Sequence, residues 1–260
     1  MKVTFLGTGT SQGVPVVACN CEVCKSADVR DKRLRSSVML EINGNNFIID
    51  AGMDFRQQML RENVKKIDAV IITHAHKDHI GGLDDVRGFN YIQRKPIDVF
   101  ASKEVTKSIK KDFCYAFEDK KFSSLPDINL HTIKNIPFEI NDIKFTPIEV
   151  LHYRLRIFGY RVGDFTYITD ASTISHTEMN KVIGSKCIVL NALRINTHIS
   201  HYNLEQAIEV LSELKPETAY LTHISHQLGL HEEVEKTLPS FIKLAYDGLK
   251  LNLPQFTPVC

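Results

Sequence analysis

The sequence lacks any hydrophobic run long enough to cross a membrane. None of its 260 residues lies in a stretch approaching the roughly 18 apolar residues that a membrane helix needs. The first residues, MKVTFLGTGT, contain an apolar run too short for the hydrophobic region of a signal peptide. We therefore expect a cytosolic (cytoplasmic) protein with no membrane partner.

The chain also lacks an excess of charge of either sign and any low-complexity linker. Lys and Arg total 32 against 31 for Asp and Glu, which leaves a formal net charge of +1. This balance disfavours a general nucleic-acid binder, so phosphate recognition must be local. A length of 260 residues without a linker predicts one α/β domain over residues 1–260.

Cysteine is scarce, yet half of it is concentrated in the stretch CNCEVC at residues 19–24. A disulfide is disfavoured in the cytosol, and Cys19 and Cys21 are too close in sequence for good disulfide geometry. Their C-x-C-x-x-C spacing, completed by Cys24, supplies three thiolates of a tetrahedral zinc site, which normally has four protein ligands. The sequence therefore predicts a fourth ligand elsewhere. The alternative is a reactive or incidental thiol cluster near Lys25.

Short β-branched runs alternate with amphipathic segments along the chain. Strands are predicted at 2–7, 37–42, 46–50, 68–73, 97–100, 143–150, 156–162, 165–170, 187–191, 218–222 and within 243–251. Helices are predicted at 54–63, 87–93, 102–111, 175–182, 204–213 and 231–237. The NGNN segment after residue 42 predicts a hairpin. Blocks of strands separated by helices indicate two facing sheets with helices outside.

The stretch ITHAHKDHIGG, residues 72–82, follows a predicted strand and precedes a helix. His74 and His76, two apart in extended backbone, can point the same way, while Asp78 and His79 lie past a turn and can face a second metal ion. The glycines that follow allow the chain to turn away. A polar surface turn is the alternative, but the strand, loop and helix context favours a metal site.

The T-H-x-H-x-D-H motif resembles that of the metallo-β-lactamase-fold hydrolases. This resemblance implies an α/β fold, a four-layer αββα sandwich, with further ligands at strand ends, and His152 in EVLHYR, Asp170 in FTYITD and His223 in AYLTH match them. The resemblance implies a first ion on His74, His76 and His152, a second on Asp78, His79 and His223, and Asp170 bridging both. Imidazoles and carboxylates suit zinc, manganese or iron without choosing among them.

Two ions that share a hydroxide nucleophile suit in-line displacement at a phosphodiester, whose leaving alkoxide needs a proton. His201, in HISHYNLEQA, is the candidate general acid, and Asp78 is counted with it as catalytic. The alternative assignment makes His198 the acid and leaves His201 as a surface residue before a helix capped by Asn203.

Three further features resemble the PhnP-like cyclic-phosphate phosphodiesterases: LGTGTSQGVP at 6–15, the cysteine cluster, and LTHISHQ at 221–227. This resemblance implies a structural zinc held by Cys19, Cys21, Cys24 and His226. It implies a small phosphorylated substrate such as 5-phosphoribosyl 1,2-cyclic phosphate, with two catalytic manganese or zinc ions.

Arginines near the predicted ligands are candidates for substrate binding. Arg154 and Arg194 could form part of an arginine fork that holds a second phosphate or a sugar oxygen, whereas Arg156 is interpreted as a solvated strand charge.

Several other functions remain open. An RNase-Z-like nuclease acting on tRNA precursors would need a long basic arm, but KSIKKDF and EDKKF are short. A non-hydrolytic metal-binding module conflicts with the complete ligand set, and lactam or thioester hydrolysis is open on the fold alone. The sequence does not decide whether the chain forms a homodimer.

Overall fold

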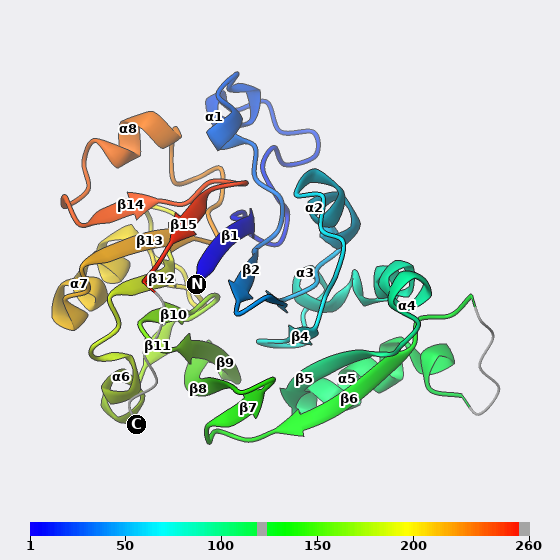
Figure 1. Cartoon of the computed structure of the whole chain (residues 1–260). Helices are drawn as coiled ribbons and strands as arrows, with labels where there is room; N and C mark the ends of the chain where they lie inside the picture. The colour runs from blue at the N-terminus through cyan, green and yellow to red at the C-terminus, as the bar shows by residue number, and fades with distance from the viewer. Residues whose placement is uncertain (119–123, 255–260) are drawn as a thin grey trace.

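A computed structural model describes residues 1–118 and 124–254, and within them two β-sheets face each other (Figure 1). The first is a 7-stranded sheet in the order β15-β1-β2-β3-β4-β5-β6. Its strands are β1 (Lys2–Gly7), β2 (Ser37–Ile42), β3 (Asn45–Ile49), β4 (Ala69–Ile71), β5 (Ile97–Ser102), β6 (Ile128–Ile133) and β15 (Lys250–Asn252). Pairing is antiparallel from β15 to β3 and parallel from β3 to β6.

The second sheet follows the order β11-β8-β9-β10-β12-β13-β14, with β7 paired to β8. Its strands are β7 (Phe138–Ile140), β8 (Ile143–His152), β9 (Leu155–Val162), β10 (Phe165–Tyr167), β11 (Thr173–Ile174), β12 (Cys187–Asn191), β13 (Thr218–Thr222) and β14 (Ile242–Leu244). From β10 to β14 the pairing is parallel. The carboxyl ends of β10, β12 and β13 therefore meet at one edge.

The predicted hairpin between β2 and β3 is confirmed. Asn43 and Gly44 both have positive φ, 49° and 78°, and the flanking Ile42 pairs with Asn45. This two-residue turn matches the twist of the strands, which explains the Asn-Gly pair in the sequence.

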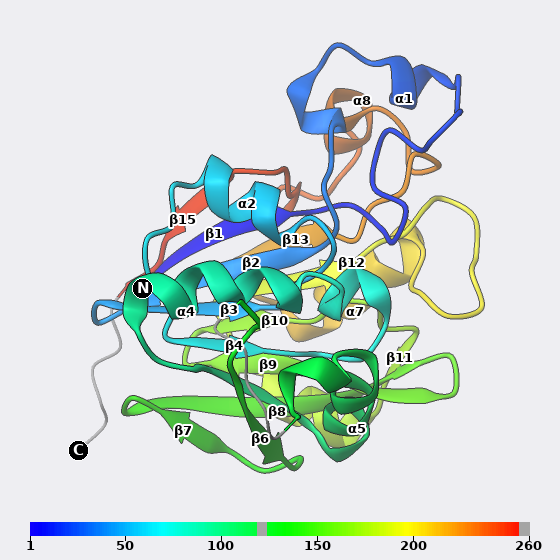
Figure 2. The same cartoon turned by 90° about the vertical axis from the view of Figure 1, so that its right-hand side faces the viewer.

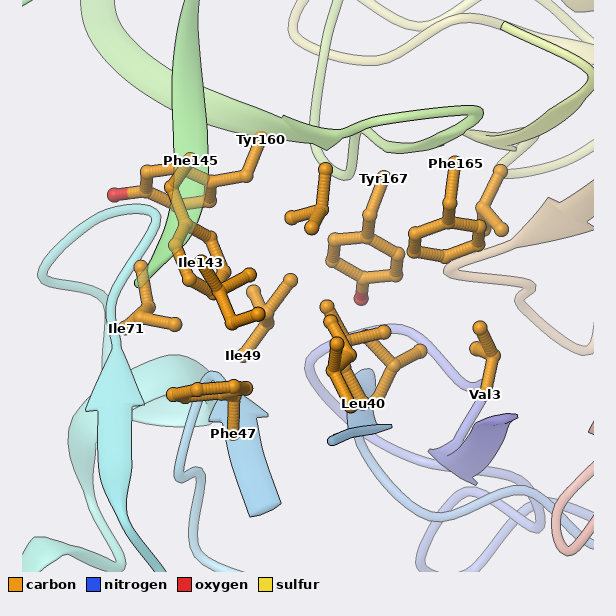
Figure 3. Close-up of a cluster of buried hydrophobic side chains, with 14 of the residues drawn as sticks. Val3, Leu40, Phe47, Ile49, Ile71, Ile143, Phe145, Tyr160, Phe165 and Tyr167 are labelled. Atoms are coloured by element: carbon orange, nitrogen blue, oxygen red, sulfur yellow. The ribbon is translucent and has the colours of Figure 1, made fainter. Parts of the chain in front are cut away.

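Apolar side chains from both sheets form the core between them (Figure 3). Along β2, Val38 and Leu40 point into this core, whereas Met39 belongs to the cluster on the outer face. The alternation follows from the period of two in a strand. Phe47 and Phe145 meet across the sheets with ring centroids 5.3 Å apart.

Helices cover the outer faces of the two sheets (Figure 2). The first sheet is covered by α2 (Phe55–Arg61), α3 (Lys77–Ile80), α4 (Arg87–Gln93) and α5 (Lys103–Asp112). The second sheet is covered by α6 (His176–Val182), α7 (Leu204–Leu214) and α8 (His231–Glu235). The short helix α1 (Glu22–Lys25) lies in the cysteine loop. The predicted four-layer αββα fold is confirmed.

Two helices begin at the polar capping residues that the sequence offers, Ser102 and Asn203. The Ser102 hydroxyl accepts from the Val105 N–H, and Asn203 forms a capping box with Gln206. Among the described residues no helix is long and apolar enough to traverse a bilayer.

Several local predictions differ from the structure, and the strand expected at 165–170 already ends at Tyr167. The strand expected at 68–73 ends at Ile71, because the Thr73 N–H donates to the Asp50 carboxylate at 2.8 Å instead of to a neighbouring strand. The short strands β7 and β11 carried too few residues for a pattern to stand out. Most of EDKKF and the end of the predicted 1–260 domain lie outside the described residues.

Candidate metal centre

The predicted metal ligands all lie where strands end. His74 and His76 follow β4, Asp78 and His79 lie in α3, and His152 ends β8. Asp170 follows β10, and His223 follows β13. Strand carboxyl ends from both sheets thus deliver imidazoles and carboxylates to one edge of the sandwich.

These side chains form two groups whose ligand atoms lie within 4.8 Å of one another. The groups are His74, His76 and His152, and Asp78, His79, Asp170 and His223. Asp170 reaches toward both groups: its Oδ2 lies 3.8 Å from His74 Nε2, and its Oδ1 lies 3.0 Å from His223 Nδ1. The structure therefore brings together all seven residues in the two predicted sets.

Three buried residues of the site adopt the left-handed backbone conformation. Asp50, Asp170 and His223 have φ of 66°, 60° and 55°. A non-glycine residue in this region costs on the order of 1–3 kcal/mol, and such strain clusters at functional sites. The surrounding contacts must hold these three turns.

Asp50 is a functional residue that the sequence analysis missed. Its Oδ2 accepts from the Nδ1–H of His79 at 2.7 Å, and its Oδ1 accepts from the Thr73 N–H at 2.8 Å. This contact fixes the His79 tautomer and leaves Nε2 free to bind an ion. The only signal in the sequence was an acidic residue after the buried run NFII.

The Asp170 turn is held by another residue that the sequence analysis missed. The Asn191 side chain accepts from the Ala171 N–H at 2.7 Å and donates to the Ala171 carbonyl at 2.9 Å. Asn191 is the last residue of β12, the parallel neighbour of β10. An amide that pairs with both backbone groups of one residue holds the chain directly after Asp170 in place.

Gly52 permits the close approach of the Asp50 turn to α3. A Cβ atom at Gly52 would lie 1.9 Å from the carbonyl oxygen of Asp78. Only glycine lets the backbone segments pack at this distance.

Burial and neighbouring charges shift the pKa values of the site in opposite directions. Burial lowers the pKa of His74 well below its usual value. Burial also disfavours charge on Asp170, but the rings of His223 and His79 outweigh it and hold the pKa of this carboxyl well below its usual range. Burial disfavours charge on His79 as well, but Asp170 and Asp50 outweigh it and hold the pKa of this imidazole well above its usual value. The shifts of His74 and Asp170 thus favour the protonation states that metal ligation requires, whereas His79 would have to release a proton to bind an ion.

The arrangement fits divalent ions. His79 Nε2 is buried without a hydrogen-bond partner, and it lies 3.1 Å from Asp78 Oδ2 and 3.5 Å from Asp170 Oδ1. Two ligand atoms that share one ion in tetrahedral geometry lie about 3.4 Å apart, given metal distances near 2.1 Å. A cation between these atoms would satisfy the buried nitrogen.

The cysteine cluster meets His226 as the sequence analysis expected. His226 Nδ1 lies 3.3 Å from Cys19 Sγ, 3.3 Å from Cys21 Sγ and 3.6 Å from Cys24 Sγ. Zinc with bonds of about 2.3 Å to sulfur and 2.0 Å to nitrogen would place the ligand atoms about 3.5 Å apart. The four side chains can therefore hold one tetrahedral zinc ion.

The N-terminal loop also contacts the predicted ligand His223 and its neighbour directly. The Thr10 N–H donates to the Ile224 carbonyl at 3.1 Å, and Thr10 Oγ1 lies 3.2 Å from His223 Nε2. Ser36 Oγ lies 3.2 Å from His223 Nδ1. The N-terminal loop is therefore attached at two neighbouring places, through Thr10 at His223 and through its cysteines at His226.

Both candidate acids lie on the loop between β12 and α7. The His201 ring lies 4.7 Å from the His152 ring and 4.9 Å from the His223 ring, and its buried Nδ1 has no partner in the described part of the chain. His198 lies farther out, 5.2 Å from His201, and its Nδ1 contacts Ser200.

The candidate arginines have different surroundings. Arg194 donates to the Asn196 and Thr197 carbonyls and to Gln227 Oε1, so its guanidinium holds the loop that carries His198. Arg156 pairs with Glu149 at 2.8 Å and is largely exposed, as expected for a solvated strand charge. Arg154 lies over the Tyr153 ring at 5.1 Å.

The two facing sheets and the cluster of His and Asp side chains at their edge indicate the class of protein to which the chain belongs. A family model described as the β-lactamase superfamily domain matches residues 45–224. The chain belongs to this superfamily.

A narrower assignment follows from solved structures. The crystal structure of a diphosphatase of the PhnP family is 40% identical, covers 98% of each chain and superposes with a TM-score of 0.92. The chain therefore belongs to the PhnP family. Human tRNase Z, short form, at 18% identity and a TM-score of 0.71, shares the fold.

Curated relatives match less of their own length. An octanoyltransferase of Porphyromonas gingivalis is 37% identical over 253 residues, which cover 96% of this chain and 51% of that protein. A ribonuclease Z of Prochlorococcus marinus is 28% identical over 172 residues, which cover 63% of this chain and 50% of that protein. The chain spans about half the length of the curated relatives that it matches.

Proposed function

We propose that the protein is a metal-dependent phosphodiesterase that hydrolyses a small cyclic phosphate ester, with 5-phosphoribosyl 1,2-cyclic phosphate as the leading candidate. The observation that carries the proposal is the pair of adjoining ligand groups, with Asp170 reaching toward both. Such an arrangement suits an anionic ester whose oxygens can occupy two neighbouring ions.

The ligand assignment follows the two groups. His74, His76 and His152 would hold one divalent ion, manganese or zinc; Asp78, His79 and His223 would hold the other, and Asp170 would bridge them. Two such ions, when bound, supply Lewis-acid stabilisation and a water of lowered pKa. The residues around them orient the ligands: Asp50 fixes His79, and Ser200 O lies 2.9 Å from His152 Nδ1.

His201 is the proposed general acid. Its ring contacts a ligand of each group, so a leaving oxygen released there lies within its reach. Burial and the His223 ring lower the pKa of His201 to about 3, so the protein environment alone favours the neutral ring. A bound phosphate anion acts in the opposite direction and would help His201 carry the proton.

Other residues have roles in the same proposal. Cys19, Cys21, Cys24 and His226 would hold a structural zinc that fixes the N-terminal loop beside His223. Arg154 is the better candidate for substrate contact, because the donors of Arg194 are already used on its own loop. The whole chain would act as one domain in the cytoplasm on a small phosphorylated substrate.

A second candidate substrate is a diphosphate. It is favoured by the 40% identical PhnP-family protein, which is called a diphosphatase. An anhydride also presents bridging and non-bridging oxygens to two ions, so the same ligand groups suit it. Acyl transfer is not proposed, because the relative with that name is matched over 51% of its length.

Hydrolysis rates across a substrate panel would separate these possibilities. Protein loaded with manganese or zinc would be given phosphoribosyl 1,2-cyclic phosphate, cyclic nucleotides, a nucleoside diphosphate and precursor tRNA. We expect the highest kcat/KM on a small cyclic ester. A higher value on the diphosphate would select the second candidate, and efficient cleavage of precursor tRNA would replace both with a nuclease function like that named for the ribonuclease Z relatives.

A further inference from the structure

The proposed general acid His201 lies on the loop between β12 and α7, residues 192–203, which projects from the edge of the sandwich (Figure 2). In the described part of the chain the buried Nδ1 of its ring has no hydrogen-bond partner, so no bond at that atom orients the ring. Three neighbouring rings surround it instead, with centroid distances of 4.7 Å to His152, 4.9 Å to His223 and 5.2 Å to His198. The orientation of His201 therefore depends on how these three rings are held.

The three rings differ in how firmly the fold holds them. Two belong to predicted metal ligands and are buried. The third ring, His198, is only partly buried and lies in the segment 195–199, whose other residues are exposed. Its Nδ1 lies 3.1 Å from Ser200 Oγ, within the same loop. The place of His198 beside His201 therefore depends on the conformation of this exposed segment.

The Arg194 guanidinium holds the exposed segment. It donates from Nη2 to the Thr197 carbonyl at 2.7 Å and from Nε to the Asn196 carbonyl at 3.2 Å. Its Nη1 donates to Gln227 Oε1 at 3.0 Å, and Gln227 directly follows the predicted zinc ligand His226. Because the donors of a guanidinium form a rigid planar fork, one side chain ties the segment to the turn after β13.

The backbone of Arg194 is itself fixed at the base of the loop. The Arg194 carbonyl accepts from the N–H of Leu204, the first residue of α7, at 3.0 Å. The neighbouring Leu193 carbonyl accepts from the Ser225 N–H at 2.9 Å. The Leu193 N–H donates to the Tyr202 carbonyl at 3.0 Å and so closes the loop. A side chain that starts from this fixed point can set the conformation of the segment beyond it.

We propose that Arg194 is a positioning residue for the general acid: it holds the segment 195–199 so that His198 packs against His201 and keeps that ring directed at the leaving oxygen. The inference rests on the proposed function, since it takes His201 as the acid. It gives Arg194 a role in proton delivery that involves no contact with the substrate.

The dependence on the leaving group separates positioning from a general structural role. Manganese-loaded protein would be given phosphoribosyl 1,2-cyclic phosphate, whose leaving alkoxide needs a proton, and bis(p-nitrophenyl) phosphate, whose nitrophenolate leaves without one. Because a small displacement of a catalytic group is costly, Arg194→Gln should lower kcat on the cyclic ester about tenfold and kcat on the nitrophenyl diester by no more than about twofold. In a His201→Ala background the same change should cause no further loss on the cyclic ester.

Fluorescence measures the loop without turnover. The chain contains no tryptophan, and Ile199 is 70% exposed, so Ile199→Trp would place a single reporter in the segment. Adding Arg194→Gln should lower the fluorescence anisotropy of this reporter, since a released loop moves on the nanosecond timescale.

Two further variants are matched to Arg194→Gln. Arg161 also donates to three backbone carbonyls, each at 2.7 Å, those of Gly163, Lys181 and Ile183. It lies near the end of β9, whereas His152 pairs with the first residue of that strand. Arg161→Gln should therefore change neither the ratio of the two kcat values nor the anisotropy. Gln227→Ala removes one acceptor of Arg194 from an exposed side chain and should give the same selective loss at a smaller magnitude.

Three results would overturn the positioning role. These are equal losses of kcat on both esters in Arg194→Gln, a further loss on the cyclic ester in the His201→Ala background, and an unchanged anisotropy. Failure of the wild-type protein to hydrolyse either ester would instead refute the proposed function, and the anisotropy would still decide whether Arg194 holds the loop.

Discussion

Replacing Asp50 by asparagine tests the geometry of the metal centre through one hydrogen bond. The Asp50 carboxylate accepts from the Thr73 N–H on Oδ1 and from His79 Nδ1–H on Oδ2. An asparagine amide must keep its oxygen toward Thr73, since a backbone N–H can only donate. Its NH₂ then faces His79 Nδ1, which must become an acceptor, so the proton moves to Nε2. A protonated Nε2 cannot bind an ion.

The expected loss of metal affinity follows from this change of the His79 tautomer. Loss of an orienting partner of a ligating histidine typically costs about 10–100-fold in metal affinity. If the ring keeps its tautomer, two donors face each other in a fully buried place, which costs about 1–3 kcal/mol. Asp50 is 0% exposed, so water cannot relieve the conflict.

Metal content after dialysis and a competitive chelator titration would measure the change, with urea unfolding in parallel. Asp68→Asn is the matched control, because Asp68 is also buried and accepts from the Asn46 N–H at 2.9 Å, away from the ligands. It should affect unfolding but leave metal affinity unchanged. An Asp50→Asn protein that binds its ions as tightly as the wild type would refute the tautomer reasoning.

Three other substitutions test separate parts of the structure. His201→Ala should slow esters with alkoxide leaving groups by about 100-fold or more, and nitrophenyl esters far less; equal losses in kcat would contradict the acid role. Cys21→Ser should weaken the proposed zinc closure between positions 205 residues apart and lower the free energy of unfolding by up to about 5 kcal/mol; unchanged denaturant midpoints would exclude a structural role. Gly52→Ala places a Cβ 1.9 Å from the Asp78 carbonyl oxygen and should cost about 1–3 kcal/mol in thermal unfolding, with loss of bound metal. Gly88→Ala, where nothing lies within 4 Å of the added carbon, should be neutral, and equal effects of the two glycine variants would contradict the packing explanation.

The T-H-x-H-x-D-H motif is readable in the sequence, and the family resemblance then directs the search for further ligands to the strand ends that carry His152, Asp170 and His223. His152 is the last residue of β8, and Asp170 and His223 follow β10 and β13, short runs that are almost entirely buried. Strand ends that share an edge bring these distant residues together in the structure, whereas from the sequence their grouping followed only from the resemblance. The fold class followed from the same alternation of strands and helices.

The supporting contacts could not be predicted in the same way. Asp50 and His79 are 29 residues apart, and Ser36 and His223 are 187 apart. Such pairs depend on how turns pack across the edge of the sandwich, and no local pattern encodes that packing.

The contact between the cysteine cluster and His226 bears on the order of events during protein synthesis. The cysteines leave the ribosome first, and His226 follows 202 residues after Cys24. At about 5–20 residues per second, this interval lasts on the order of 10–40 s. During this interval the nascent chain carries the three thiols without His226. His223 is also still missing from the edge of the sandwich where the other predicted ligands lie. Both proposed metal sites can therefore be completed only when β13 and the turn after it have been translated.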